Sequence, residues 1–134
     1  MSLKFAVVAN LNVVVIGALL MIGCASELHH TPTQFRPSTS EGGRFLVIAR
    51  DLTVVPASGY PRTLKAGSTW RYVGRTPQGA VLQVKDDVFV IGGRNRHEAY
   101  CVVSDDYKLV GFFLPVEQAF TPLSSPVQLP IVQK

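Results

Sequence analysis

The chain has 134 residues, of which 47% are hydrophobic and 16% are charged, and its formal net charge at pH 7 is +4. This length allows one small domain and excludes a multidomain enzyme. The positive surplus is mild and contains no run of Lys and Arg, so we expect no nucleic acid among the partners.

The first 23 residues have the order of an export signal. Lys4 supplies a basic start, an apolar run fills Val13–Gly23, and Cys24 follows a small residue directly. The segment 1–23 resembles the signal peptide of bacterial lipoproteins, whose lipobox ends in an acylated cysteine. The resemblance implies cleavage after Gly23 and an N-acyl, S-diacylglyceryl group on Cys24, with no other cofactor.

The predicted anchor also implies a location in the cell. Because Ala25 and Ser26 place no aspartate after the cysteine, the resemblance implies the outer membrane, with the domain in the periplasm. Two alternatives remain: Phe5–Ile22 is a plain transmembrane helix of about 18 residues, the lower limit for spanning, or a conventional secretion signal precedes an incidental Cys24. Asn10 and Asn12 interrupt the stretch and favour a signal peptide.

Residues 24–43 predict a lipid-anchored flexible linker. Glu27–Gly43 is rich in Pro, Ser, Thr and Gly and has no apolar period, which is typical of a linker or of a segment that orders on a partner. His29 and His30 lack the spaced third ligand of a metal site, so we expect no metal here.

Residues 44–120 predict an all-β domain. Short apolar runs are separated by turn residues, which indicates a small barrel or sandwich. The expected strands are Phe45–Ala49, Asp51–Val55, Trp70–Gly74, Ala80–Lys85, Val88–Ile91, His97–Ser104 and Tyr107–Leu114.

Three segments of this domain follow the order of a known fold. Leu52–Val55, Thr63–Trp70 and Val73–Val84 resemble the bacterial SH3-like barrel, with Tyr107–Pro115 as its closing strand. The resemblance implies a small barrel and assigns cell-wall binding to no particular residue.

No catalytic set is evident. His97 and Cys101 lie four apart in an expected strand, which separates them by about 13 Å along one face. The apolar context of Cys101 favours a buried, inert thiol. Asp86-Asp87 and Asp105-Asp106 lie between apolar runs and predict turns rather than metal ligands. We therefore expect no enzyme activity, no catalytic residue and no metal site.

Some strands are apolar on both faces. Leu109–Leu114 would bury both sides, so either a partner or the chain's own tail covers one of them. The proline-spaced tail, residues 121–134, is extended and can add as a strand to an edge of its own domain or of a neighbour. The expected partner contacts are Phe112, Phe113, Val127, Leu129 and Ile131.

Two functions follow as hypotheses. The first is a non-enzymatic outer-membrane lipoprotein that is a structural or accessory subunit, in a homo- or hetero-oligomer, of a secretion, conjugation, pilus or flagellar assembly. The alternative is a lipoprotein module that binds peptidoglycan or another glycan through Tyr60, Trp70, Arg71 and Tyr72.

Overall fold

The structure is a computed structural model that describes residues 28–39, 43–57 and 59–132. Within these ranges the chain is all-β, which confirms the predicted fold class. No helix among the described residues is long and apolar enough to cross a membrane. The signal peptide predicted at 1–23 and the acylation site predicted at Cys24 lie outside the described residues.

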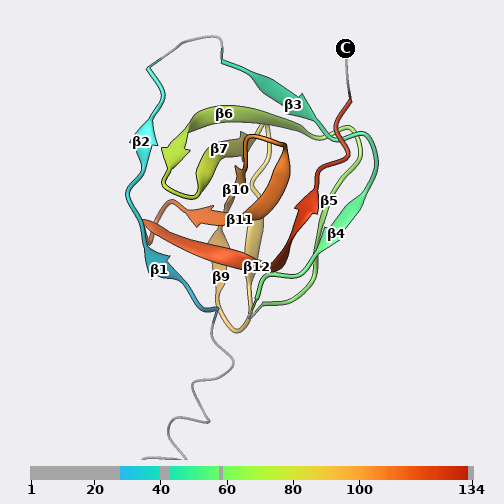
Figure 1. Ribbon diagram of the computed structural model, residues 1–134. Helices are drawn as coiled ribbons and strands as arrows, with labels where there is room; N and C mark the ends of the chain where they lie inside the picture. The colour runs from blue at the N-terminus through green and yellow to red at the C-terminus, as the bar shows by residue number, and fades with distance from the viewer. Residues whose placement is uncertain (1–27, 40–42, 58, 133–134) are drawn as a thin grey trace, which may run out of the picture.

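The described residues contain twelve strands, most of which are labelled in Figure 1. They are β1 (Thr31–Pro32), β2 (Arg36–Pro37), β3 (Phe45–Val47), β4 (Leu52–Val54), β5 (Arg62–Leu64), β6 (Thr69–Thr76), β7 (Gly79–Val84), β8 (Val90–Gly92), β9 (Arg96–Glu98), β10 (Tyr100–Val103), β11 (Lys108–Leu114) and β12 (Ala119–Gln128). The strand predicted at His97–Ser104 is divided at Ala99, because β9 pairs with β8 whereas β10 pairs with β7 and β11.

One curled antiparallel sheet forms the body of the molecule (Figure 1). Its strand order is β1-β12-β11-β10-β7-β6-β2, and β3 also pairs with β6. The hairpins β4–β5 and β8–β9 form two further small sheets. The curl is consistent with a small SH3-like barrel, since it gives the main sheet a concave inner face and a convex outer face.

The C-terminal tail joins the two ends of this curled sheet. Past β12, the N–H of Val132 donates to the carbonyl of Val47 at 2.8 Å, and Ile131 forms a bridge with Ile48. Because β3 also pairs with β6, the tail connects the β12 end of the sheet to the β6 end. The tail therefore packs on its own domain, and the domain extends beyond the boundary predicted at residue 120.

The inner face encloses the main hydrophobic core. Its buried members include Trp70, Leu64, Ile91 and Phe112. The Trp70 ring meets Phe89 edge-on at 5.4 Å, and its indole N–H donates to Ser68 Oγ at 3.0 Å. The pairing of this indole group removes the usual cost of burying a polar N–H.

The outer face carries a second apolar cluster that the N-terminal segment covers. We call residues 28–39 the strap. Its Phe35 ring stacks on Phe113 at 4.9 Å, beside Val81, Val102 and Phe120. This cover explains why β10 and β11 are apolar on both faces.

Over residues 28–39, the strap corrects the prediction of a flexible linker, which covered residues 24–43. β1 pairs with β12 and β2 pairs with β6, so residues 28–39 belong to the fold. Gly74 permits this contact, because a Cβ there would collide with the Phe35 ring and the Arg36 carbonyl oxygen. Leu28 and Phe35 anchor the strap in the two apolar clusters, and the backbone N–H groups of Thr33 and Ser38 donate to the carbonyls of Gln118 and Val73.

Candidate functional site

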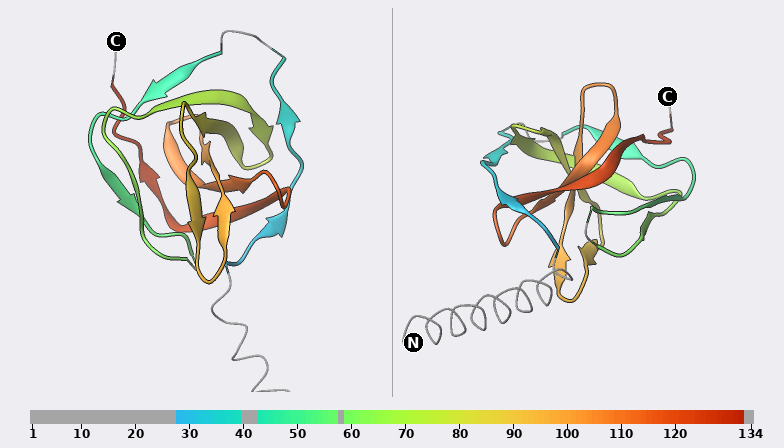
Figure 2. Two further views of the ribbon diagram at one scale, coloured as in Figure 1. Left: turned by 180° about the vertical axis from the view of Figure 1, so that it is seen from behind. Right: turned by 60° about the horizontal axis from the view of Figure 1, so that its bottom comes forward.

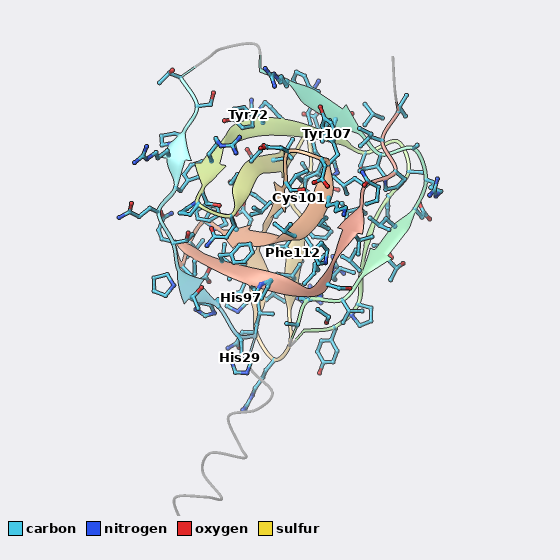
Figure 3. The ribbon with its side chains drawn as sticks, viewed as in Figure 1. His29, Tyr72, His97, Cys101, Tyr107 and Phe112 are labelled. Carbon is cyan, nitrogen blue, oxygen red and sulfur yellow. The ribbon has the colours of Figure 1, made fainter. Side chains whose placement is uncertain are left out.

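A cleft of about 540 Å³ opens at one end of the barrel. Its floor is apolar, and two tyrosines and two arginines stand around it. The residues used below are Arg44, Leu46, Tyr72, Arg75, Leu82, Val103, Asp105 and Tyr107. Figure 3 shows Tyr72 and Tyr107 at the same end of the molecule.

The sheet positions the floor and Tyr72. Leu82 and Val103 point to the inner face from β7 and β10, and Leu46 adds to them from β3. Tyr72 packs against the same core from β6. The pairing of β6 with β7 shifts register between Tyr72 and Gly74, so the strand is distorted next to this ring.

A tight turn between β10 and β11 holds Tyr107 at the rim. The N–H of Tyr107 donates to the Ser104 carbonyl at 3.0 Å, and the N–H of Lys108 donates to Ser104 Oγ at 3.1 Å. The Ser104 hydroxyl also bonds the Asp106 carboxylate, and this bond is the main reason that the pKa of Asp106 is lowered. Tyr107 adopts φ 62°, and the side chain is left half in solvent.

The charges around the cleft favour an anion. Arg75 lies 3.7 Å from Asp105, but their side chains are 53% and 96% exposed, so solvent screens this pair strongly. Arg44 is also exposed and lines the same cleft. The lining charges therefore sum to a surplus of one positive charge. An aromatic and aliphatic surface beside two guanidinium groups suits a ligand with an apolar face and a carboxylate.

The structure separates the four residues predicted to bind a glycan. Tyr72 lines the cleft, whereas Trp70 is 3% exposed and belongs to the core, which corrects its predicted role. Arg71 lies next to Gln83 on the outer side of β6, at 3.4 Å. Tyr60 is exposed in the loop before β5 and bonds through its N–H to Gly92. A linear pattern of aromatic residues cannot show which of them the barrel will bury.

The residues predicted to contact a partner are mostly buried within the chain. Phe112 and Phe113 are 0% and 1% exposed, and Leu129 is 5% exposed. Val127 and Ile131 are half-buried against the core. The burial of Phe112, Phe113 and Leu129 within the chain corrects their predicted role, whereas contact of the partly exposed Val127 and Ile131 with a partner stays a prediction.

His97 and Cys101 have separate roles in the structure. His97 Nδ1 lies 2.7 Å from Glu117 Oε1. Partial burial is the largest single effect on Glu117 and opposes its ionisation, but the His97 hydrogen bond, a backbone hydrogen bond and the two nearby imidazoles together outweigh it and lower the Glu117 pKa. Cys101 is buried, and this burial raises the pKa of its thiol. The described residues contain no group of three or more His, Cys, Asp or Glu arranged to hold a metal ion.

Sequence reasoning missed Arg44, Arg75 and Tyr107. The signal for Tyr107 is an aromatic residue directly after the Asp105-Asp106 turn, since such a ring is held at the tip of a hairpin. Arg44 directly precedes β3 and Arg75 belongs to β6, and these segments pair only in the folded sheet, so neither residue has a local signal.

Comparison of the chain with known protein families, with characterised proteins and with solved structures finds no match. The function is therefore argued from the geometry of the cleft.

Proposed function

We propose that this protein is a non-enzymatic envelope lipoprotein whose barrel binds a carboxylate-bearing fragment of the cell wall. Acylated Cys24 anchors it in the outer membrane, and the barrel lies in the periplasm. The observation that carries the proposal is the cleft, in which Tyr72 and Tyr107 stand over an apolar floor beside Arg44 and Arg75.

The size and chemistry of the cleft support a small ligand. Its volume of about 540 Å³ lies within the range of about 300–1,000 Å³ that is typical of ligand sites. Tyrosine rings pack against the apolar faces of sugars and peptide side chains. Arginine binds carboxylates through two parallel bonds, and Arg75 can exchange its long, exposed contact with Asp105 for such a pair.

The binding role is better supported than the role of assembly subunit. The subunit hypothesis depended on apolar strand faces and on a tail available to a neighbour. The strap covers the outer face, and the tail bonds to β3 of its own chain. A peptidoglycan or glycan ligand needs neither feature.

The test is sedimentation of the detergent-extracted full-length protein with purified peptidoglycan sacculi. We expect the protein to sediment, and we expect Arg44→Ala and Tyr72→Leu each to weaken binding by about tenfold, because each loses contacts worth about 1.4 kcal/mol. Arg71→Ala is the matched control, since Arg71 is a neighbouring cation on the outer side of β6. No sedimentation of the unsubstituted protein, or equal loss in the control, would contradict the proposal.

The anchor is tested on the same preparation by intact mass. We expect the mass of a chain that begins at Cys24 and carries fatty acyl groups. A chain that begins elsewhere, or that has no acyl mass, would remove the lipoprotein part of the proposal and leave the cleft as a separate question.

A further inference from the structure

Leu28, the first residue that the structure describes, lies in the core of the barrel. Leu28 is 4% exposed and belongs to the main core. A Cβ on Gly59 would lie 3.2 Å from Leu28 Cδ1 and 3.5 Å from the Gly92 carbonyl oxygen. The N–H of Tyr60 donates to that carbonyl at 3.3 Å. Leu28 is therefore held between the β4–β5 loop and hairpin β8–β9.

This burial limits how far the barrel can stand from its anchor. Only Ala25, Ser26 and Glu27 separate Cys24 from Leu28. Four residue steps of about 3.3–3.6 Å give a maximum reach of about 14 Å, whatever their conformation. A free linker up to residue 43 would reach several times further. If Cys24 carries the lipid, the end of the barrel at Leu28 must lie against the membrane surface.

The chemistry of this end suits a lipid headgroup layer. Arg94 and Arg96 are exposed at the tip of hairpin β8–β9, and Tyr60 is 65% exposed beside it. Basic residues at a membrane surface are attracted to anionic headgroups, and tyrosine is favoured at the interface. The nearby acids oppose this weakly, because Glu117 is bonded to His97 and Glu98 is half-buried in β9.

The cleft lies at the other end of the molecule. Figure 3 places His29 and His97 at one end and Tyr72 and Tyr107 toward the opposite end. The right-hand view of Figure 2 likewise shows hairpin β8–β9 and the β10–β11 turn at opposite ends. An anchor at Leu28 therefore directs the cleft away from the bilayer.

We propose that the end of the barrel formed by Leu28, Tyr60 and hairpin β8–β9 docks on anionic lipid headgroups. This docking orients the cleft toward the cell wall. This inference rests on the proposed acylation of Cys24. It adds the orientation of the bound barrel and the residues that fix it.

The experiment measures the distance of each end from the headgroups. The acylated full-length protein is placed in vesicles of phosphatidylethanolamine and phosphatidylglycerol that contain a headgroup-attached quencher. A fluorophore is coupled either to Tyr60→Cys or to Asp105→Cys, the matched exposed position in the β10–β11 turn. Acylation blocks the Cys24 thiol, and the burial of Cys101 protects the second native thiol.

We expect the label at position 60 to be quenched several-fold more strongly than the label at position 105. Joint Arg94→Glu and Arg96→Glu substitution is expected to reduce that difference, because the short tether remains but the attraction to the headgroups is lost, whereas Arg71→Glu with Lys85→Glu, an equal change of charge elsewhere, leaves it unchanged. Equal quenching at both positions, or no effect of the Arg94 and Arg96 reversal, overturns the docking.

The intact mass of the labelled protein shows whether a negative result contradicts the docking or the acylation of Cys24. An acylated protein with equal quenching at both ends overturns the orientation and leaves the anchor standing. A protein without acyl mass overturns the anchor, and the orientation falls with it.

Discussion

Thr76 has a buried hydroxyl group that the fold does not satisfy. The residue is buried at the end of β6, and its Oγ1 has no hydrogen-bond partner among the described residues. Burial of an unpaired hydroxyl costs about 1–3 kcal/mol. We expect Thr76→Val, which keeps the shape and removes the hydroxyl, to raise the free energy of unfolding by about 1 kcal/mol in urea titration.

Thr121 provides the matched control. It is also buried in a strand, but its hydroxyl donates to the His29 carbonyl at 2.7 Å. Thr121→Val removes a hydrogen bond between the strap and β12, so we expect it to lower the free energy of unfolding by about 1 kcal/mol. Stabilisation by both substitutions, or destabilisation by both, would contradict the assignment of Thr76 as unpaired.

The strap is the element whose role differs most from expectation. Phe35 fixes it by stacking on Phe113, across a sheet face that would otherwise be exposed. We expect Phe35→Ala to lower the free energy of unfolding by about 2 kcal/mol, because a partly buried aromatic ring and its stacking partner both lose contact. Denaturant titration measures the change.

The control for this prediction is Phe45→Ala. Phe45 is 47% exposed on β3, so its removal is expected to cost less than about 1 kcal/mol. Faster proteolysis within residues 28–39 in Phe35→Ala would accompany release of the strap. Equal costs for the two substitutions would show that the strap adds little to the stability of the barrel.

The sequence predicts the central strands because their signals are local. Ala80–Lys85 and Tyr107–Leu114 combine β-forming residues with flanking turns, and both become strands. β1 and β2 have only two residues each and no apolar period, so their pairing with β12 and β6 has no local signal.

The candidate site was predictable only in part, for a related reason. The pattern of aromatic residues with an adjacent cation predicts Tyr72 as a binding residue, and Tyr72 does line the cleft. The same reasoning selected Trp70, which the barrel buries. Arg44, Arg75 and Tyr107 come from three separate segments, and only the curl of the sheet brings them to one opening.

At the scale of the whole molecule, the pairing of the tail determines whether the barrel closes within one chain or between two. Alternation of Val127, Leu129 and Ile131 shows that the tail can pair with an edge, but it does not choose between its own domain and a neighbour. In the structure Ile131 bridges to Ile48, and Leu129 is buried in the core. Within the part of the chain that the structure describes, a barrel joined in this way leaves no long unpaired edge between β3 and β12 for a second chain.

Removal of the tail should therefore change both stability and association. Truncation after Gln128 deletes buried Leu129 and the bonds to β3, so we expect the free energy of unfolding to fall by about 3 kcal/mol. The unpaired edges of β3 and β12 would then be free to pair between molecules. Native mass in mild detergent should show a monomer for the intact protein and larger species for the truncated one.

Truncation after Val132 is the control, because it keeps every tail contact described above. This shorter deletion should leave the protein monomeric and its free energy of unfolding unchanged. If the protein truncated after Gln128 stayed monomeric and equally stable, the tail would not be what joins the barrel. A mass far above one monomer for the intact protein would instead favour the assembly-subunit role, since a partner would then occupy a surface other than the tail and the buried faces of β11.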